Sequence, residues 1–485
     1  MTKLVGLIPA AGKGVRARPY SNMIPKGMLK IGGRPNLERL ICRMRDQLQI
    51  KDIYLTVGHL GEVIKEYFKD GSWLGVRLHY VDNTELDKGL AWSVLLAGRE
   101  VTVPCCVMLS DECYIGSNHA ELLEFPYKDG LATCAITNTD DRNLISQNYS
   151  VNKDGNIVLN LLEKPSVVEN NILGQGTFVL TPQFFPLLES AFEQSPDNYV
   201  EFITFIDSLC RNKGDVLCFE MRGIYININN RDSLNIARYH LRNREFFKNR
   251  ISLLLHSEGV EKNIGVTINR YMKNGNIDEI FVVLPHKNEN KDIVLATGVE
   301  AILCPEDIEL YGDMITYGID NIPGDIVILA EASYSFPEHD INKLLEYMKD
   351  ADMVVGTRTT RQLIEQGSDI TALVRLANIF LAKFMELLWW RREVRLTDVA
   401  CTFRAIWRSS YTDIRSRLEG KGPELLSEMI IETLNDRKRI IEIPVHYFNR
   451  SEALIRKYRN RKTFFKILLM ISKKKIAYFF PQRGK

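Results

Sequence analysis

The sequence of 485 residues lacks three features that would place it in a specialised class of protein. Its nine cysteines form no C-x-x-C pair, which argues against the common zinc and redox spacings and indicates reduced thiols in a cytoplasmic protein. It has no run of about 18 uncharged apolar residues, so we expect no helix that spans a bilayer. Its 45% hydrophobic and 26% charged residues exclude a largely disordered chain.

No sign of charge dominates the whole chain, whose formal net charge is +2, but the charge is unevenly distributed. Residues 450–485 carry twelve Lys and Arg against one acid, Glu452, while the remainder has nine more acids than bases. The chain therefore combines a mildly acidic body with a strongly basic tail.

Short apolar runs alternate with helical patterns over residues 3–240 and again from residue 251. This alternation predicts an α/β protein with two Rossmann-like domains, each a largely parallel central sheet flanked by helices. We place the domains at residues 1–245 and 246–450, followed by a basic amphipathic tail at 451–485. Strands are expected at 3–9, 52–57, 76–81, 105–109, 132–137 and 176–180 in the first half, and at 251–255, 279–284, 325–329 and 352–358 in the second.

A glycine-rich segment follows the first expected strand directly. It reads Ala11-Gly-Lys-Gly-Val-Arg16, and Pro25-Lys26 comes soon after it. Glycines at the end of a strand let backbone N–H groups approach a phosphate chain, and Arg and Lys supply the countercharge. A G-x-G pair alone would equally describe a tight turn, so the argument depends on the longer segment.

The longer segment resembles the signature of sugar-1-phosphate nucleotidylyltransferases, the sugar-nucleotide pyrophosphorylases. The family pattern is G-x-G-T-R-x-x-P-x-T-x-x-x-P-K, with Val15 and Ser21 here in place of the two threonines. The matching residues are Gly12, Gly14, Arg16, Pro19, Pro25 and Lys26.

Further segments follow in the order of that family over residues 3–240. Asn83, shortly before Gly89-Leu-Ala91, stands where the family has a base-reading Gln, and an amide can serve that role. Ser110-Asp111 stands where the family places its first metal-binding carboxylate, and Glu163-Lys164-Pro resembles the segment that holds the sugar phosphate. The resemblance assigns nucleotide binding to Ala11, Gly12, Gly14, Asn83 and Gly89, and sugar-phosphate binding to Glu163 and Lys164.

The resemblance implies attack of a sugar-1-phosphate oxygen on the α-phosphorus of an NTP, with release of pyrophosphate. Arg16 and Lys26 would be the catalytic cations and Mg²⁺ would bind at Asp111. The second metal ligand of the family is an Asp, and here Asn227 takes that position. An amide oxygen still binds Mg²⁺, so three alternatives remain. Mg²⁺ binds more weakly, another acid replaces the missing carboxylate, or the domain binds nucleotides without turning them over.

Residues 251–450 resemble family 2 glycosyltransferases of the GT-A fold, especially those that transfer sugars to polyprenyl phosphates. The resemblance is best at Val355-Gly-Thr-Arg358, Thr397-Asp398 and Arg404. The metal-binding Asp-x-Asp of that family is replaced by Ala330-Glu331-Ala332. One interpretation is a degenerate domain kept for scaffolding, dimerisation or acceptor binding. The alternative keeps Glu331 as a metal ligand, Asp398 as acceptor base, and Arg358 and Arg404 as phosphate ligands.

The tail interleaves apolar and cationic residues, as in Phe464-Phe-Lys-Ile-Leu-Leu-Met-Ile471 and Lys473-Lys-Lys475. This pattern predicts either a helix on an anionic membrane surface, peripheral to the inner face of the membrane, or a helix that packs on the body or on a partner subunit. Polyprenyl phosphate is a further candidate ligand, and a homo-oligomer remains open. No recognition motif accompanies the charge, which argues against nucleic acid.

The sequence thus predicts a nucleotidyltransferase that joins UTP, dTTP or CTP to a sugar-1-phosphate for surface glycan or glycolipid synthesis. The alternatives are a glycosyltransferase acting on a lipid phosphate or saccharide, or a non-catalytic nucleotide- or lipid-binding scaffold.

Overall fold

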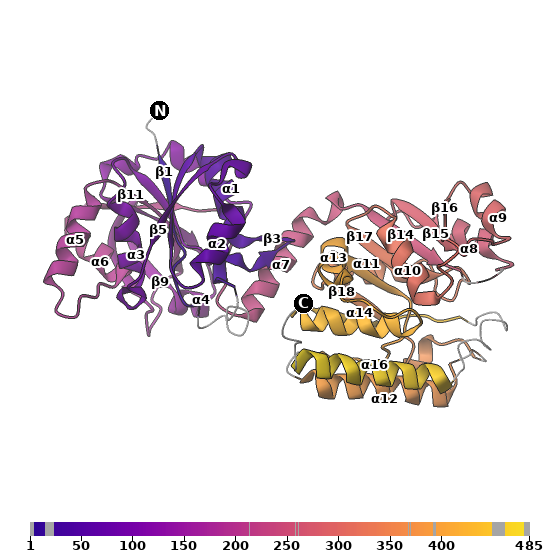
Figure 1. Ribbon diagram of the computed structural model, residues 1–485. Helices are drawn as coiled ribbons and strands as arrows, with labels where there is room; N and C mark the ends of the chain where they lie inside the picture. Colours follow the sequence, from indigo (N-terminus) through magenta and orange to yellow (C-terminus); the bar gives the residue numbers. More distant parts are fainter. Residues whose placement is uncertain are drawn as a thin grey trace. The chain divides into compact units, whose positions relative to one another are not determined.

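The computed structural model describes residues 4–14, 24–212, 214–257, 259, 261–366, 368, 370–390, 394–448 and 461–479. The chain divides into two compact units, Met1–Leu241 and Arg242–Lys485. Both units are α/β, as the alternating pattern predicts (Figure 1). Among the described residues, no helix combines the length and the apolar character needed to cross a membrane.

The first unit is built on a sheet whose order is β5-β4-β1-β6-β11-β8-β12-β10-β9 over the residues described. The strands are β1 (Val5–Pro9), β4 (Asp52–Val57), β5 (Arg77–Asp82), β6 (Cys105–Met108), β8 (Ala132–Asn138), β9 (Tyr149–Asp154), β10 (Ile157–Glu163), β11 (Ile172–Leu180) and β12 (Val216–Glu220). Two short ribbons accompany it, β2 (Lys30–Ile31) with β3 (Arg34–Pro35) and β7 (Glu112–Ile115) with β13 (Ile224–Asn227).

Helices separate these strands along the chain of the first unit. They are α1 (Asn36–Leu48), α2 (Gly61–Phe68), α3 (Gly89–Gly98), α4 (Arg142–Gln147), α5 (Phe184–Gln194), α6 (Phe202–Leu209) and α7 (Arg231–Glu245), the last of which continues into the second unit. The expected strands of this half are confirmed within a few residues. One expectation needs correction: the sheet is mixed, because β11 runs antiparallel to both β6 and β8 and β10 runs antiparallel to β9 and β12.

The parallel part of this sheet fixes the place for a ligand. Strands β4 and β5 lie on one side of β1 and strand β6 lies on the other, all four parallel. Successive strands are therefore added on opposite sides of β1, and the strand order changes direction between β1 and β6. At such a switch point the loops after the two strands diverge, and a crevice opens at their carboxyl ends.

The second unit repeats this arrangement with other strands. Its sheet has the order β16-β15-β14-β17-β19-β18-β20 within the described chain, and only β19 runs antiparallel to its neighbours. The switch point falls between β14 and β17. The strands are β14 (Ile251–His256), β15 (Glu279–Leu284), β16 (Glu300–Leu303), β17 (Ile326–Glu331), β18 (Met353–Thr357), β19 (Arg404–Trp407) and β20 (Ile440–Pro444).

Three helices of the second unit, α12, α14 and α16, pack together, and α14 also packs on strand β20 (Figure 1). Helix α16, in the predicted basic tail, packs on both α14 and α12. The helices are α8 (Ile264–Tyr271), α9 (Lys291–Ala296), α10 (Tyr311–Asp320), α11 (Asp340–Met348), α12 (Ala372–Leu388), α13 (Arg408–Arg415), α14 (Glu424–Asn435) and α16 (Arg461–Phe479).

Candidate active site in the first unit

A cavity of about 470 Å³ lies at the switch point of the first unit. The loop after β1 and the loop after β6 both line it, as the sheet order requires. The structure brings ten of the predicted residues to this one cavity: Ala11, Gly12, Gly14, Lys26, Asn83, Gly89, Asp111, Glu163, Lys164 and Asn227. Arg16 lies outside the described residues. The roles assigned to these residues remain predictions.

Lys26 and Asp111 form the electrostatic centre of the cavity. The Lys26 ammonium donates to Asp111 Oδ2 at 2.6 Å and to Asn229 Oδ1 at 2.9 Å. Both charged side chains are largely buried, so their attraction is weakly screened by solvent. Asn229, which the sequence analysis missed, lies two residues after Asn227 and accepts the second hydrogen bond of the Lys26 ammonium.

Asn227, the second predicted metal ligand, lines the same cavity as Asp111. Its Nδ2 donates to Asn148 Oδ1 at 3.1 Å, while its buried Oδ1 accepts no hydrogen bond from the described residues. The main chain of the next residue, Ile228, donates to Asp111 O at 2.8 Å, which keeps the two segments together. A carboxylate and an unsatisfied amide oxygen are the donor types that Mg²⁺ prefers, so the residues present fit this ion.

Asn83 has an internal role that its position in the sequence does not reveal. Its Nδ2 donates to Ser93 Oγ at 2.9 Å and its Oδ1 accepts from the Glu85 backbone at 2.9 Å. Only 3% of the residue is exposed. These contacts tie the loop after β5 to α3, so the geometry favours positioning of the cavity wall over reading of a base.

Glu163 and Lys164 lie together at the end of β10, with the Lys164 ammonium 2.6 Å from Glu163 Oε1. Lys164 has a left-handed backbone (φ 44°), and its N–H donates to Asn148 O at 2.6 Å. Asn148 therefore links this pair to Asn227. The link connects the predicted sugar-phosphate side of the cavity to the predicted metal side.

Glu112, which the sequence analysis also missed, is a second carboxyl beside Asp111. It is 1% exposed, and its Oε1 accepts from Tyr225 Oη at 2.9 Å. Burial, together with the charge of Asp111, raises the pKa of Glu112 to about 8. The side chain fits because Gly176 faces it, where a Cβ would approach the Glu112 carboxyl carbon to 2.7 Å.

Comparison with known proteins places the first unit in a family. A family model for nucleotidyl transferases matches residues 5–244. The first unit is a nucleotidyl transferase domain. The model leaves residues 245–485 outside its match, so the resemblance of the second half to glycosyltransferases remains a prediction.

Curated relatives align with the same half of the chain. The chain is 29% identical over 193 residues to the bifunctional protein GlmU of Methanococcus aeolicus, covering 38% of this chain and 42% of that protein. It is 30% identical over 200 residues to the UTP–glucose-1-phosphate uridylyltransferase of Synechocystis sp., covering 39% and 51%. The chain thus spans about half the length of the curated relatives it matches. A solved UDP-glucose pyrophosphorylase from Acinetobacter baumanii is 21% identical with a TM-score of 0.43, covering 51% of this chain and 98% of that chain.

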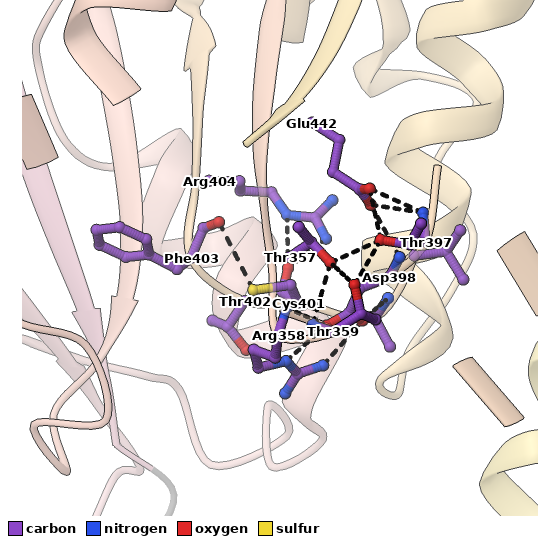
Figure 2. A network of polar contacts seen from close by, with 12 residues as sticks. Thr357, Arg358, Thr359, Thr397, Asp398, Cys401, Thr402, Phe403, Arg404 and Glu442 are labelled. Atoms are coloured by element: carbon purple, nitrogen blue, oxygen red, sulfur yellow. Dashed lines mark hydrogen bonds and ion pairs between the residues drawn. The ribbon is translucent and has the colours of Figure 1, made fainter. Parts of the chain in front are cut away.

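Three of the predicted site residues of the second unit, Arg358, Asp398 and Arg404, belong to a network of polar contacts within the fold (Figure 2). Arg358 forms a bidentate ion pair with Asp398, at 2.7 Å and 3.0 Å. Burial alone would raise the pKa of Asp398, but the Arg358 charge and the hydrogen bonds that the carboxylate accepts from Arg358 and Ala400 together outweigh burial, so the pKa is lowered. An acid with a lowered pKa in a buried pair is a poor general base, which favours the structural interpretation of Asp398.

Arg404 and Glu331 are likewise engaged within the unit. Arg404 donates to the Cys401 carbonyl at 3.1 Å and to the Leu426 carbonyl at 2.6 Å, and burial lowers the pKa of its guanidinium to about 10. Glu331 accepts from Thr402 Oγ1 at 2.9 Å and from Ser335 Oγ at 3.0 Å. Both side chains satisfy neighbouring polar groups of the fold.

We predict that Glu112→Gln removes a loss of stability between about pH 4.5 and pH 8. The folded state keeps Glu112 protonated up to about pH 8, whereas the unfolded chain releases the proton near its ordinary value of 4.5. The stabilisation is therefore complete below about pH 4.5 and is lost as the pH rises to about 8, by roughly 3–5 kcal/mol. Denaturant-dependent hydrogen exchange of β6 and β11 in Mg²⁺-free buffer measures it. If the free energy of unfolding depends on pH in the same way in the variant and in the parent, Glu112 is not buried as an uncharged acid.

We also predict that Arg358→Met destabilises the second unit by about 3–5 kcal/mol, because it leaves the Asp398 charge buried without a partner. The double variant Arg358→Met/Asp398→Asn should recover most of this loss, since no charge then remains buried. Denaturant-dependent hydrogen exchange of β17 and β19 checks both variants. A single variant with parental stability would show that the pair is dispensable for folding and would reopen its role as an acceptor site.

Proposed function

We propose that the first unit transfers a nucleotidyl group from an NTP to a sugar-1-phosphate and releases pyrophosphate. The observation that supports this most directly is the pair Lys26–Asp111 in a cavity that also holds the unsatisfied oxygen of Asn227. Lys26 provides a buried positive charge, and the oxygen atoms of Asp111 and Asn227 beside it would bind a metal ion. Transfer between two phosphorylated substrates gathers negative charge, and cations at this point are its principal requirement.

The reaction proceeds by in-line displacement. A phosphate oxygen of the sugar-1-phosphate forms a new bond to the α-phosphorus, the bond from that phosphorus to the β-phosphate oxygen breaks, and pyrophosphate leaves with the electron pair. Lys26 neutralises the reacting phosphates and holds them in line. The backbone of Gly12 and Gly14 follows the NTP phosphates, with Arg16 as the predicted partner of the β- and γ-phosphates.

The remaining residues position the substrates. Glu163 and Lys164 orient the sugar phosphate, and Asn83 with Gly89 shapes the nucleoside end of the cavity. Asp111 and Asn227 would hold Mg²⁺, which would supply further neutralisation of phosphate charge when bound. We favour UTP as the NTP and glucose-1-phosphate as the first sugar to test, since relatives of this half are named for that pair.

For the second unit we propose a non-catalytic role. Ala330 and Ala332, which flank Glu331 at the end of β17, are at most 1% exposed and provide no metal ligand. Glu331, Arg358, Asp398 and Arg404 are all bound within the fold. A glycosyltransferase activity of this unit would need groups other than these four.

The test of the first proposal is pyrophosphate release from purified protein with Mg²⁺, each NTP in turn and a panel of sugar-1-phosphates. We expect release for one pair, reduced about 10²–10³-fold or more by Lys26→Ala. Lys51→Ala, which removes an exposed lysine that does not line the cavity, is the matched control and should retain parental rates. No release with any pair, while nucleotides still bind by calorimetry, would sink the catalytic proposal.

A second variant tests the metal site. Asn227→Asp should lower the Mg²⁺ concentration needed for half-maximal rate by about tenfold, because a carboxylate binds a hard cation more tightly than an amide. Asn160→Asp adds the same charge at an exposed position and should leave the Mg²⁺ dependence unchanged. If both variants match the parent, Asn227 does not bind the ion.

A further inference from the structure

Helix α12 presents a long apolar stripe to solvent. The exposed positions Leu373, Leu376, Phe380, Lys383 and Leu387 recur every three or four residues, which places them on one side of the helix, and the exposed Trp390 follows shortly after its C-terminal end. Leu373 is 80% exposed and Leu387 is 69% exposed. The opposite side of the same helix packs into the core through Leu381, Ala382 and Met385. Helix α12 is therefore apolar on both sides, and the described part of the chain covers only one of them.

Helix α16 continues this surface. It is anchored to α14 by the buried Ile467 and Ile471 and by Lys474, whose ammonium lies 2.7 Å from Glu428 and 2.9 Å from Glu432. Its outer side exposes Phe465, Leu469 and Ile476, of which Leu469 is 75% exposed. Part of the prediction for the tail is thus met, because the helix packs on the body and still presents apolar residues outward.

The two outer sides form one face. The rings of Phe380 and Phe464 are 6.1 Å apart, and the Lys475 ammonium lies 4.7 Å from the centre of the Trp389 ring. Phe380 lies midway along α12 and Trp389 directly follows that helix, while Phe464 lies near the start of α16 and Lys475 near its end. The two helices therefore run side by side in the same direction. We call this surface the α12–α16 face, defined by Leu373, Leu376, Phe380, Leu387, Trp390, Phe465, Leu469 and Ile476.

The charge on this face is mostly positive. Lys462, Lys466 and Lys473 are exposed on α16, which contains no acid over Arg461–Phe479. One acid lies beside them, because Glu419 is 3.6 Å from the Lys473 ammonium in an exposed ion pair, which solvent screens. On α12, Lys383 is half exposed, and the acid of that helix, Glu386, is bound to Lys383 at 2.8 Å and mostly buried. Large apolar side chains among lysines suit the boundary between headgroups and acyl chains of an anionic bilayer.

We propose that the α12–α16 face binds the surface of an anionic lipid bilayer, with both helices lying in the plane of the interface. A second copy of the chain is a poorer occupant, because a two-fold interface would bring like charges together. A bilayer adapts to isolated side chains along two helices without a matching groove, and anionic headgroups complement the lysines. This inference is independent of the proposed function of the first unit, because it concerns only the second.

The test is sedimentation of the full chain with vesicles. We expect binding to phosphatidylcholine vesicles that contain roughly one-third phosphatidylglycerol, and binding at least about tenfold weaker to pure phosphatidylcholine. Leu376→Ser/Phe380→Ser should weaken binding to the mixed vesicles by about tenfold or more. Its matched control is Phe247→Ser/Leu310→Ser, which removes the same two residue types at positions 81% and 53% exposed and should bind as the parent does.

The cationic contribution is tested separately. Lys466→Gln/Lys473→Gln should weaken binding by about tenfold or more, whereas Lys287→Gln/Lys291→Gln, at exposed positions away from the face, should have no effect. Equal binding by parent and face variants would overturn the proposal. A second result would also overturn it: no vesicle binding, together with a dimer in light scattering that Leu376→Ser/Phe380→Ser dissociates. The face would then join two copies of this chain.

Discussion

The ion pair between Lys26 and Asp111 is the contact on which the candidate site depends. It joins the segment after β1 to the segment after β6, which are separated by 85 positions along the chain. Each partner alone would be a costly charge in a largely buried place, and together they offset one another's loss of hydration. The pair therefore fixes the width of the crevice at the switch point. The pair also places the Lys26 ammonium beside the oxygen ligands of the predicted metal site. Phosphoryl transfer needs positive charge at this point, from the lysine and from a metal ion.

Glycines in β11 make room for the polar groups around that pair. A Cβ at Gly174 would lie 1.9 Å from the ring of Tyr149, and one at Gly176 would meet Glu112. The two glycines thus let a buried tyrosine and a buried acid occupy the floor of the cavity. The same acid is held by Tyr225, on the strand that also carries Asn227. The packing of Glu112 at the cavity floor therefore helps to determine where Asn227, the predicted metal ligand, is placed.

The sequence predicted most of the fold because buried strands and their spacing are local signals. It predicted the loops around Gly12 and Asp111 for the same reason, since each follows a strand directly. It missed the antiparallel course of β11, because direction is set by pairing with β6 and β8 and leaves no mark in the strand itself. Glu112 and Asn229 were missed because their importance arises only where distant segments meet. Asn83 occupied the expected cavity, yet its contact with Ser93 could be known only from the packing of α3.

The similar sheets of the two units hold an acid in different surroundings. Each places an acid near the end of the strand beyond the switch point, Asp111 in one and Glu331 in the other. In the first unit the acid faces a cavity, and its partner is a lysine that substrates can share. In the second unit Glu331 accepts two hydroxyl groups, and the nearby Arg358 is matched by Asp398. Groups already satisfied by the fold gain little from a ligand, whereas the unsatisfied oxygen of Asn227 gains a great deal. The difference between these two acids therefore lies in the polar groups that the fold places around each of them, and not in the topology that carries them.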